Sequence, residues 1–206
     1  KPLFLSEIGD MRIGWKDTNP GPKSFAAALS NAESVLRGLS AGVSAFNRWS
    51  FTNRGDLDGQ WQLIRTWDIE NQRYYYKIDV EPAAFYGYGI ITRFMEKHSS
   101  VVHTDTIVNP AILSQTLKSN DGKLTTYILN KSDTAQVVRI KMTGVDDQML
   151  YLYRVTEQEV TSPGFRMDPL KEIDVRDGKI IALDLPAKSI STLTSFRSMH
   201  NDPARK

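Results

Sequence analysis

Apolar residues in the first part of the chain follow the pattern of alternating strands and helices. The apolar run Leu3–Ile8 predicts a fully buried strand, and Val43–Phe51 predicts a second one. Between them, Ser24 precedes a segment whose apolar residues recur at three- and four-residue steps, as on one face of a helix. Pro82 suits the first turn of another helix, and residues 53–75 are expected to be a long loop. Sequential strand and helix units of this kind make parallel sheets.

From about Ser99 the pattern changes to short strands separated by turns. Turn signals occur at Asn120-Asp121-Gly122 and at Asp177-Gly178, and residues 138–142 alternate apolar and basic side chains. The candidate strands are Val101–Ile107, Ile112–Leu117, Leu124–Asn130, Val137–Met142, Leu150–Val155, Ile180–Leu185 and Ile190–Phe196. Short strands at regular spacing favour an antiparallel β-sandwich over residues 99–200, followed by a frayed polar tail at 201–206.

Composition removes several classes of function. The net charge of +2 comes from 26 basic and 24 acidic residues that are scattered along the chain, which argues against a nucleic-acid partner. No apolar run approaches the ~20 residues of a membrane helix. The chain has no Cys, which excludes disulfides and thiol chemistry, and its three His are not at metal-ligand spacing. We therefore expect a protein without metal or cofactor.

Glu7 is a carboxylate at the C-terminal end of the predicted strand Leu3–Ile8. A carboxylate is expensive to bury there without a partner. In βα-barrels the catalytic groups gather at the C-terminal ends of the strands, so Glu7 is a candidate catalytic residue. The alternative is a structural carboxylate that pairs with Arg12 or Arg48.

Trp49 ends the second predicted strand beside Asn47 and Arg48, and Asp56 follows in the loop. An indole ring stacks on the C–H face of a sugar, while Asn, Asp and Arg side chains hydrogen-bond its hydroxyls. The segment therefore predicts one wall of a sugar-binding site. The alternative is that Trp49 is an ordinary core residue.

With these residues in view, the sequence resembles clan A of the glycoside hydrolases, especially families 30, 39 and 79, whose members carry an appended β-sandwich. The segment at residues 3–9 resembles the seventh barrel strand, which ends in the catalytic nucleophile. Residues 42–50 resemble the eighth strand, which ends in the sugar-platform Trp, and a cis peptide is expected at Trp49–Ser50. Residues 85–94 and 185–193 resemble the last barrel helix and the closing sandwich strand.

The resemblance implies a fold and a chemistry. Residues 1–98 would be the C-terminal part of a (β/α)8 TIM barrel, with strands 7 and 8 and their helices. The reaction would be retaining hydrolysis of glycosidic bonds, in which one carboxylic acid protonates the leaving oxygen and Glu7 attacks the anomeric carbon. Substrate-binding residues would be Trp49, Asn47, Arg48, Arg12 and Asp56. The partner is a carbohydrate, and the expected location is extracellular or periplasmic, in a bacterium.

The chain departs from the family at the acid/base residue. In the clan this Glu follows the fourth strand, usually in an Asn-Glu pair, and the first 98 residues contain no such dipeptide. A whole barrel needs ~250 residues. We therefore expect the rest of the barrel in a missing N-terminal portion of the same protein, and we expect this chain alone to hydrolyse nothing.

Two other functions fit the same residues. The first is a non-catalytic carbohydrate-binding protein that uses exposed aromatic side chains such as Tyr151 and Tyr153 on one strand face. The second is a structural relative of the hydrolases in which the site has degenerated.

Overall fold

The computed structural model describes residues 1–9, 24–52, 62–68, 71–103 and 109–198. It is built mostly of strands, with few helices. The chain divides into two compact units, Lys1–Gly89 and Ile90–Lys206, and each is described here by itself. The division falls inside helix α2 (Pro82–Thr92), ahead of the boundary expected after residue 98.

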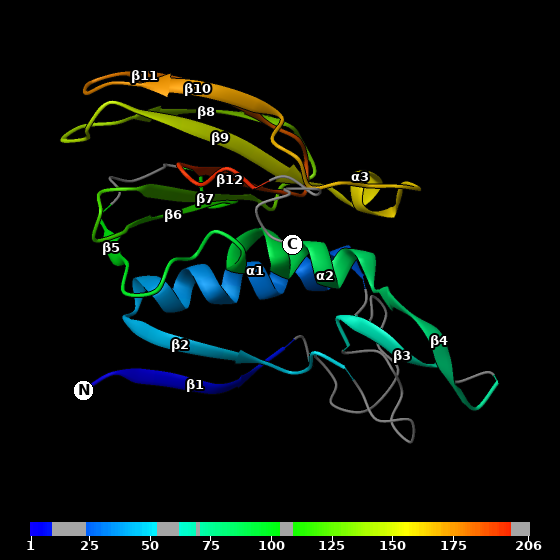
Figure 1. The fold of residues 1–206 in the computed structure, drawn as a ribbon. Coiled ribbons are helices and arrows are strands. Elements are labelled where there is room, and N and C mark those ends of the chain that lie inside the picture. Colours follow the sequence, from blue (N-terminus) through cyan, green and yellow to red (C-terminus); the bar gives the residue numbers. More distant parts are fainter. Residues whose placement is uncertain (10–23, 53–61, 69–70, 104–108, 199–206) are drawn as a thin grey trace. The chain divides into compact units, whose positions relative to one another are not determined.

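The first unit begins with a parallel pair of strands beside a helix. Strands β1 (Leu3–Ile8) and β2 (Val43–Arg48) are parallel, and helix α1 (Phe25–Ser40) runs between them in the sequence and beside β2 in space (Figure 1). The strand–helix–strand order predicted from the sequence is therefore confirmed. The expectation that both strands are fully buried is wrong for this chain, because no residue of β1 is buried and Val43 is the one buried residue of β2, which ends at Arg48 and not at Phe51. Parallel strands require such a crossover connection, because the chain must return to the same end of the sheet.

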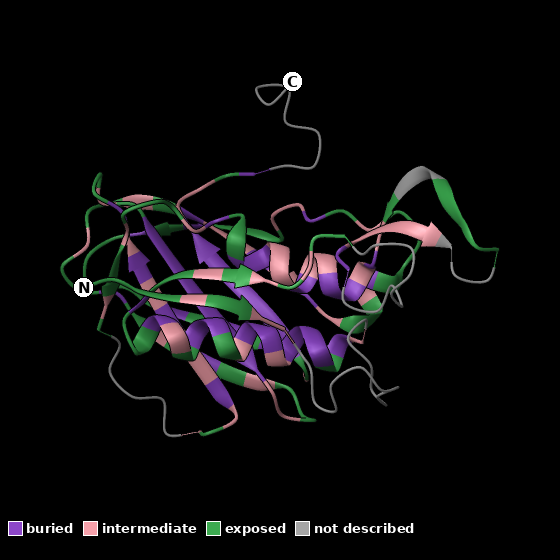
Figure 2. Ribbon diagram, turned by 90° about the horizontal axis from the view of Figure 1, so that it is seen from below, coloured by how far each residue is buried: buried purple, intermediate pink, exposed green. Residues whose placement is uncertain are grey.

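Helix α1 has the beginning and the buried face that the sequence predicts. Ser24 is the N-cap residue, and its side chain accepts a hydrogen bond from the backbone N–H of Ala27 at 3.1 Å. The apolar residues that recur at three- and four-residue steps are all buried, and they form a stripe along the helix in Figure 2: Phe25, Ala28, Leu29, Ala32, Val35, Leu36 and Leu39. Gly38 lies in the last turns, where an added Cβ would come within 2.7 Å of the Phe46 ring of β2. The lack of a side chain at Gly38 thus allows α1 to approach β2 closely.

The long connection after β2 contains a β-hairpin that the sequence did not predict. Strands β3 (Ile64–Asp68) and β4 (Arg73–Val80) are antiparallel, and they lie beyond the carboxyl end of β2 (Figure 1). The hairpin was missed because its turn has neither Gly nor Pro. Gln72 adopts a positive φ of 50° there, a conformation in which Gly or Asn is more usual.

The second unit contains two antiparallel sheets. The six-stranded sheet has the order β10-β9-β12-β7-β6-β5, and the two-stranded sheet pairs β11 with β8. The strands are β5 (Ser100–Val102), β6 (Ile112–Lys118), β7 (Leu124–Asn130), β8 (Gln136–Lys141), β9 (Gln148–Val155), β10 (Lys171–Val175), β11 (Ile180–Leu185) and β12 (Ser189–Thr194), with a short helix α3 (Glu157–Thr161) after β9. Each predicted strand from Ile112 onward is present within two residues of its predicted bounds, whereas residues 104–107 of the predicted strand Val101–Ile107 lie outside the described residues.

The two sheets share one hydrophobic core. Its buried members come from both sheets: Ile112, Leu124, Ile128, Val138, Met142, Leu150, Ile173, Val175, Ile181, Leu183, Leu185 and Leu193. The alternation predicted for β8 is confirmed, since Val138 is buried while Arg139 and Lys141 are exposed. Strand β10 was not predicted because charged residues dominate it. Its position at the edge of the sheet explains this composition, as charged side chains there oppose pairing with other chains.

The end of α2 belongs to the second unit and is bound to the six-stranded sheet by side-chain hydroxyls. Thr192 donates to the carbonyl oxygen of Ile90 at 3.1 Å, and buried Tyr127 donates to that of Ile91 at 2.9 Å. Thr125 donates to the carbonyl oxygen of Phe94 just beyond the helix, at 3.1 Å. The last four carbonyls of a helix have no partner within it. The hydroxyls from the sheet therefore satisfy two of these carbonyls, and a third hydroxyl binds the carbonyl of Phe94, two residues beyond the helix.

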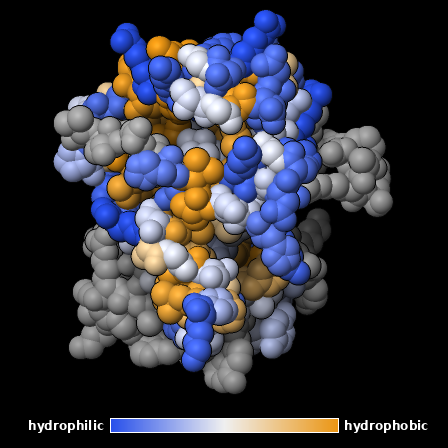
Figure 3. Space-filling model, turned by 90° about the vertical axis from the view of Figure 1, so that its left-hand side faces the viewer, coloured by the Kyte–Doolittle hydropathy of each residue, from blue (hydrophilic) through white to orange (hydrophobic). Residues whose placement is uncertain are grey.

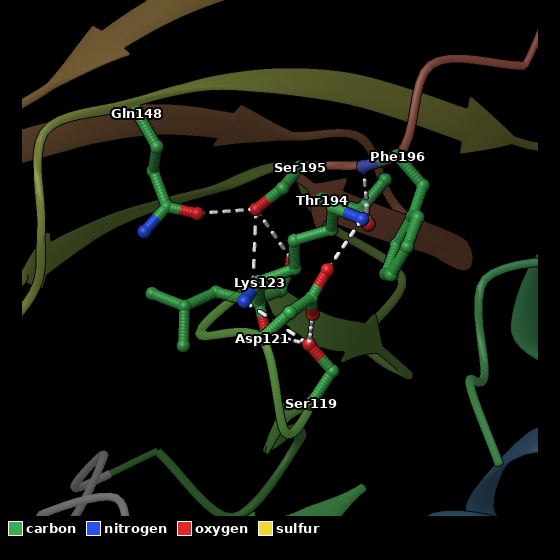
Figure 4. A network of polar contacts seen from close by, with 8 residues as sticks. Ser119, Asp121, Lys123, Gln148, Thr194, Ser195 and Phe196 are labelled. Carbon is green, nitrogen blue, oxygen red and sulfur yellow. Dashed lines mark hydrogen bonds and ion pairs between the residues drawn. The ribbon is translucent and has the colours of Figure 1, made fainter.

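A polar network lies at the end of β12 (Figure 4). The backbone N–H of Leu124 donates to Ser195 Oγ at 2.9 Å, and the Ser195 hydroxyl donates to the side-chain oxygen of Gln148. The Asp121 carboxylate in the β6–β7 turn binds Lys123 Nζ at 2.6 Å and accepts from the Ser119 hydroxyl. The turn and the end of the sheet are thus held by side chains that have polar partners.

Among the described helices, none is long and apolar enough to cross a membrane.

Candidate active site

The carboxyl ends of β1 and β2 form one edge of the parallel pair. Ile8 is in register with Arg48, so the end of one strand lies beside the end of the other. The backbone N–H of Trp49 donates to the carbonyl oxygen of Ile8 at 2.8 Å, which extends the pairing past the end of β2. Gly9 lies against the same turn, because an added Cβ would be 3.1 Å from the Trp49 carbonyl oxygen. The geometry therefore brings the ends of both strands into close backbone contact.

Glu7 precedes Ile8 at this edge, and its side chain is exposed. Trp49 stands at the end of the neighbouring strand with 40% of its surface exposed. The peptide bond between Trp49 and Ser50 is cis, as the resemblance implies. A carboxylate and an open indole ring thus occupy adjacent strand ends, an arrangement that suits a site for a polar ligand with apolar faces.

Arg48 is held from two sides. Its Nη1 atom donates to the carbonyl oxygen of Ser50 at 3.1 Å, and its guanidinium carbon lies 5.9 Å from the centre of the Tyr88 ring of α2. Burial lowers the pKa of the Arg48 guanidinium below its usual value, an effect that the nearby Tyr88 partly offsets. Burial also raises the pKa of the Tyr88 hydroxyl, and the charge of Arg48 opposes that rise. The Arg48 side chain therefore holds the segment after Trp49 by a hydrogen bond to the backbone of Ser50.

The other expected substrate-binding residues are placed only in part. Asn47 is exposed near the end of β2, at the same edge as Glu7. Arg12 and Asp56 lie outside the described residues. The structure therefore brings together Glu7, Asn47, Arg48 and Trp49 among the residues expected from the sequence.

Two other carboxylates of the first unit, Glu33 and Glu81, form ion pairs with arginine side chains. Glu33 pairs with Arg37 one turn further along α1, at 2.7 Å. Glu81 is buried and receives two hydrogen bonds from the Arg65 guanidinium, at 2.9 and 3.1 Å. Glu70 lies outside the described residues. No group of three or more His, Asp or Glu side chains within the described part of the chain could hold a metal ion.

The aromatic surface expected on β9 is absent, because Tyr153 is buried. Its ring packs against Phe94 with the ring centres 4.4 Å apart, and its hydroxyl accepts from the backbone N–H of Ser198 at 2.7 Å. Tyr151 is half-buried beneath Arg197, whose guanidinium lies 5.7 Å from the ring centre. The prediction that these two rings form an exposed glycan platform is therefore wrong.

The hairpin of β3 and β4, which the sequence did not indicate, begins next to the candidate site. The backbone N–H groups of Leu63 and Ile64 both donate to the carbonyl oxygen of Phe51, at 3.1 and 3.0 Å. The hairpin thus begins directly beside the residues that follow Trp49. Its aromatic residues Trp67 and Tyr74 form an edge-to-face pair with ring centres 4.8 Å apart.

Comparisons with known proteins agree with this geometry at the level of the fold. No protein-family model and no curated protein matches the chain. Among solved structures, a family 30 glycoside hydrolase endoxylanase from Clostridium papyrosolvens C71 is similar, with a TM-score of 0.65 and 16% identity over 96% of this chain and 42% of its own. SrfJ from Salmonella typhimurium matches with a TM-score of 0.63 and 15% identity over 96% of this chain and 35% of its own.

A more distant likeness is to Cel44A, a family 44 endoglucanase from Clostridium thermocellum, with a TM-score of 0.59 and 10% identity. It covers 94% of this chain and 31% of that protein. The chain thus spans less than half the length of each of these three structures. At such low identities the likeness establishes the fold alone, and the chain has the fold found in the C-terminal portions of glycoside hydrolase domains.

Proposed function

We propose that this chain is the C-terminal portion of a retaining glycoside hydrolase, with Glu7 as its nucleophile. One observation carries the proposal: an exposed carboxylate and an exposed indole ring stand on adjacent ends of two parallel strands. Catalytic groups of βα-barrels occupy this edge of the sheet. The fold of the chain, shared with glycoside hydrolases of families 30 and 44, supports the same reading.

The proposed reaction has two steps. In the first, the Glu7 carboxylate attacks the anomeric carbon while a carboxylic acid protonates the leaving oxygen, which yields a glycosyl ester of Glu7 and a shortened sugar chain. In the second, the acid, now ionised, takes a proton from water, and the water oxygen displaces Glu7 from the anomeric carbon. Trp49 would stack on the sugar ring, Asn47 and Arg12 would hydrogen-bond its hydroxyls together with Asp56, and Arg48 would fix the turn beneath it.

The acid would come from a barrel portion that precedes this chain in the full-length enzyme. Strand β1 supports this arrangement, because Leu3 and Phe4 are 51% and 62% exposed although strands of parallel sheets are normally covered on both faces. Hydrophobic surface lies open between hydrophilic side chains on the face of the molecule in Figure 3. We propose that residues 1–98 complete a (β/α)8 barrel, that residues 99–200 form its β-sandwich, and that the enzyme acts outside the cytoplasm.

The test is a comparison of two isosteric changes in the full-length enzyme, meaning this chain together with the proposed upstream barrel. Glu7→Gln removes the nucleophile and should lower kcat on aryl glycosides by at least about a thousandfold. Glu33→Gln is the matched control, since it makes the same chemical change on α1, where Glu33 pairs with Arg37. A 2-fluoro glycoside should trap a covalent adduct on the peptide that carries Glu7. Full activity of the Glu7→Gln enzyme would sink the assignment and favour a degenerate relative.

A further inference from the structure

The hairpin of β3 and β4 is fixed rigidly to the candidate site. The backbone N–H of Leu63 donates to the Ser50 and Phe51 carbonyl oxygens at 3.2 and 3.1 Å, and the hydroxyls of Thr52 and Thr66 are 2.5 Å apart. These contacts join the hairpin to the three residues that follow Trp49. The hairpin is therefore hydrogen-bonded to the segment that directly follows Trp49.

An ion pair braces the base of the hairpin. Arg65 binds the buried Glu81 carboxylate through two nitrogen atoms, at 2.9 and 3.1 Å, and also approaches Asp79 at 3.4 Å. The hydrogen bonds and charge of Glu81 raise the pKa of Arg65 above its usual value. A guanidinium that binds a carboxylate with two parallel hydrogen bonds is geometrically constrained. The base of the hairpin thus has a defined orientation with respect to the start of α2.

The outer half of the hairpin presents aromatic rings to solvent. Tyr74 is 67% exposed and Tyr75 is 44% exposed. The rings of Tyr74 and Trp67 also form an edge-to-face pair across the two strands. Between the Arg65–Asp79 and Trp67–Tyr74 pairs, β3 contributes one residue, Thr66, while β4 contributes residues 75–78. The register irregularity is a β-bulge, which interrupts the regular pairing of β4 with β3.

We propose that this hairpin is a binding arm for an extended polysaccharide, in which Tyr74 and Tyr75 stack on sugar rings beyond the one held by Trp49. The inference rests on the proposed function and adds a substrate class to it, namely a polymer in place of a short glycoside.

The composition of the arm favours a glycan over a protein or a lipid surface. Residues 71–75 read Asn-Gln-Arg-Tyr-Tyr, so two amide side chains and a guanidinium precede two phenol rings, and none of these five side chains is aliphatic. Sugars need this combination, because their hydroxyls accept and donate hydrogen bonds while their C–H faces pack on rings. A protein interface or a membrane surface would be expected to add aliphatic anchors.

Affinity electrophoresis of the full-length enzyme tests the proposal by binding alone. The background is Glu7→Gln, which is designed to leave the polymer intact in the gel, and the probes are soluble xylan, xyloglucan and hydroxyethyl cellulose. We expect at least one polymer to retard the protein, and Tyr74→Ala with Tyr75→Ala to weaken that retardation about tenfold in apparent Kd. The double change to Phe keeps both rings and should preserve binding, and Leu170→Ala is a control at an exposed apolar residue elsewhere.

The outcomes separate this inference from the proposed function. Equal retardation of the Ala variant and the parent protein would overturn the binding arm. A lower melting temperature of the Ala variant without a change in binding would also overturn it, because it would mean that another part of the protein covers the rings. Lack of retardation by all three polymers would also overturn it. The proposed function fails on a different result, namely undiminished hydrolysis by the Glu7→Gln enzyme.

Discussion

Trp49 is joined to Ile8 by a backbone hydrogen bond of 2.8 Å, from the N–H of Trp49 to the carbonyl oxygen of Ile8. The bond lies one residue past Glu7 on β1 and one residue past the end of β2. Both side chains of interest are therefore carried by backbone that the parallel pairing fixes. A reacting group and a ring platform on separate loops would be held less rigidly, since loops are the more mobile parts of a fold.

Removal of the Trp49 ring should weaken the site without unfolding it. Trp49 is partly exposed, so Trp49→Ala loses little core packing. In the full-length enzyme we expect kcat/KM on polysaccharide to fall about tenfold or more, equivalent to ~1.4 kcal/mol. Trp49→Phe retains an aromatic face and should recover part of the loss. Unchanged kcat/KM in Trp49→Ala would show that the ring does not contact the substrate.

Sequence reasoning located the elements whose signals are local. Ser24 caps α1 because a hydroxyl at that position satisfies a free backbone N–H, and Pro82 begins α2 because its missing N–H is not needed there. Strands β7 and β11 have the predicted bounds, since apolar residues predominate in each strand and turn residues flank it in the sequence. Glu7 and Trp49 were proposed from their places at strand ends, and the backbone register places those ends side by side.

The features that escaped prediction depend on contacts distant in the sequence. The hairpin of β3 and β4 turns at Gln72 without Gly or Pro, so no local signal marked it. Tyr153 looked like a surface residue, yet Phe94 covers its ring, and nothing near position 153 could reveal that. The phenol rings now proposed to bind sugar lie at Tyr74 and Tyr75, inside the segment expected to be a loop.

Gly38 and Gly89 should respond in opposite directions to a change to Ala. The Cβ of Gly38→Ala would lie 2.6 Å from a Phe46 ring atom, and overpacking of this kind costs typically ~1–3 kcal/mol. The gain in helix propensity offsets up to ~1 kcal/mol, so we expect a net loss of about 1–2 kcal/mol in urea unfolding. An added Cβ at Gly89 meets no atom within 4 Å, so Gly89→Ala should be neutral or stabilising. Equal effects at both positions would contradict the close approach of α1 to β2.

Tyr127→Phe should destabilise the second unit through a single hydrogen bond. The change leaves the ring in place but removes the donor to the Ile91 carbonyl oxygen, which lies in the last turn of α2. Loss of one buried hydrogen bond costs about 1–2 kcal/mol, measurable by denaturant unfolding at neutral pH. Tyr74→Phe, at an exposed ring, is the matched control and should stay within about 0.5 kcal/mol of the parent.

The burial of Tyr127 also predicts that the stability of the protein falls at alkaline pH. Burial raises the pKa of the Tyr127 hydroxyl well above its usual value. A group whose pKa is raised by folding contributes stability that is complete below the unfolded pKa of ~10 and is lost as pH rises above it. The stability difference between the parent and Tyr127→Phe should therefore narrow above about pH 10. A difference that stays constant through this range would mean that Tyr127 ionises as easily in the folded protein as in the unfolded chain.

Asp121 should titrate at low pH because the β6–β7 turn surrounds its carboxylate with donors. Hydrogen bonds from Lys123 and from the Ser119 hydroxyl lower the pKa of Asp121 to about 2 (Figure 4). Folding depresses this pKa, so the stability it contributes is complete above the unfolded value of ~3.9 and is lost as pH falls through about 2. NMR titration of the side-chain carboxyl carbon should give a midpoint near that folded value. Lys123→Met removes the main donor and should move the midpoint up toward ~3.9, whereas Ser119→Ala should move it less. An unchanged midpoint in Lys123→Met would show that Lys123 does not set the pKa.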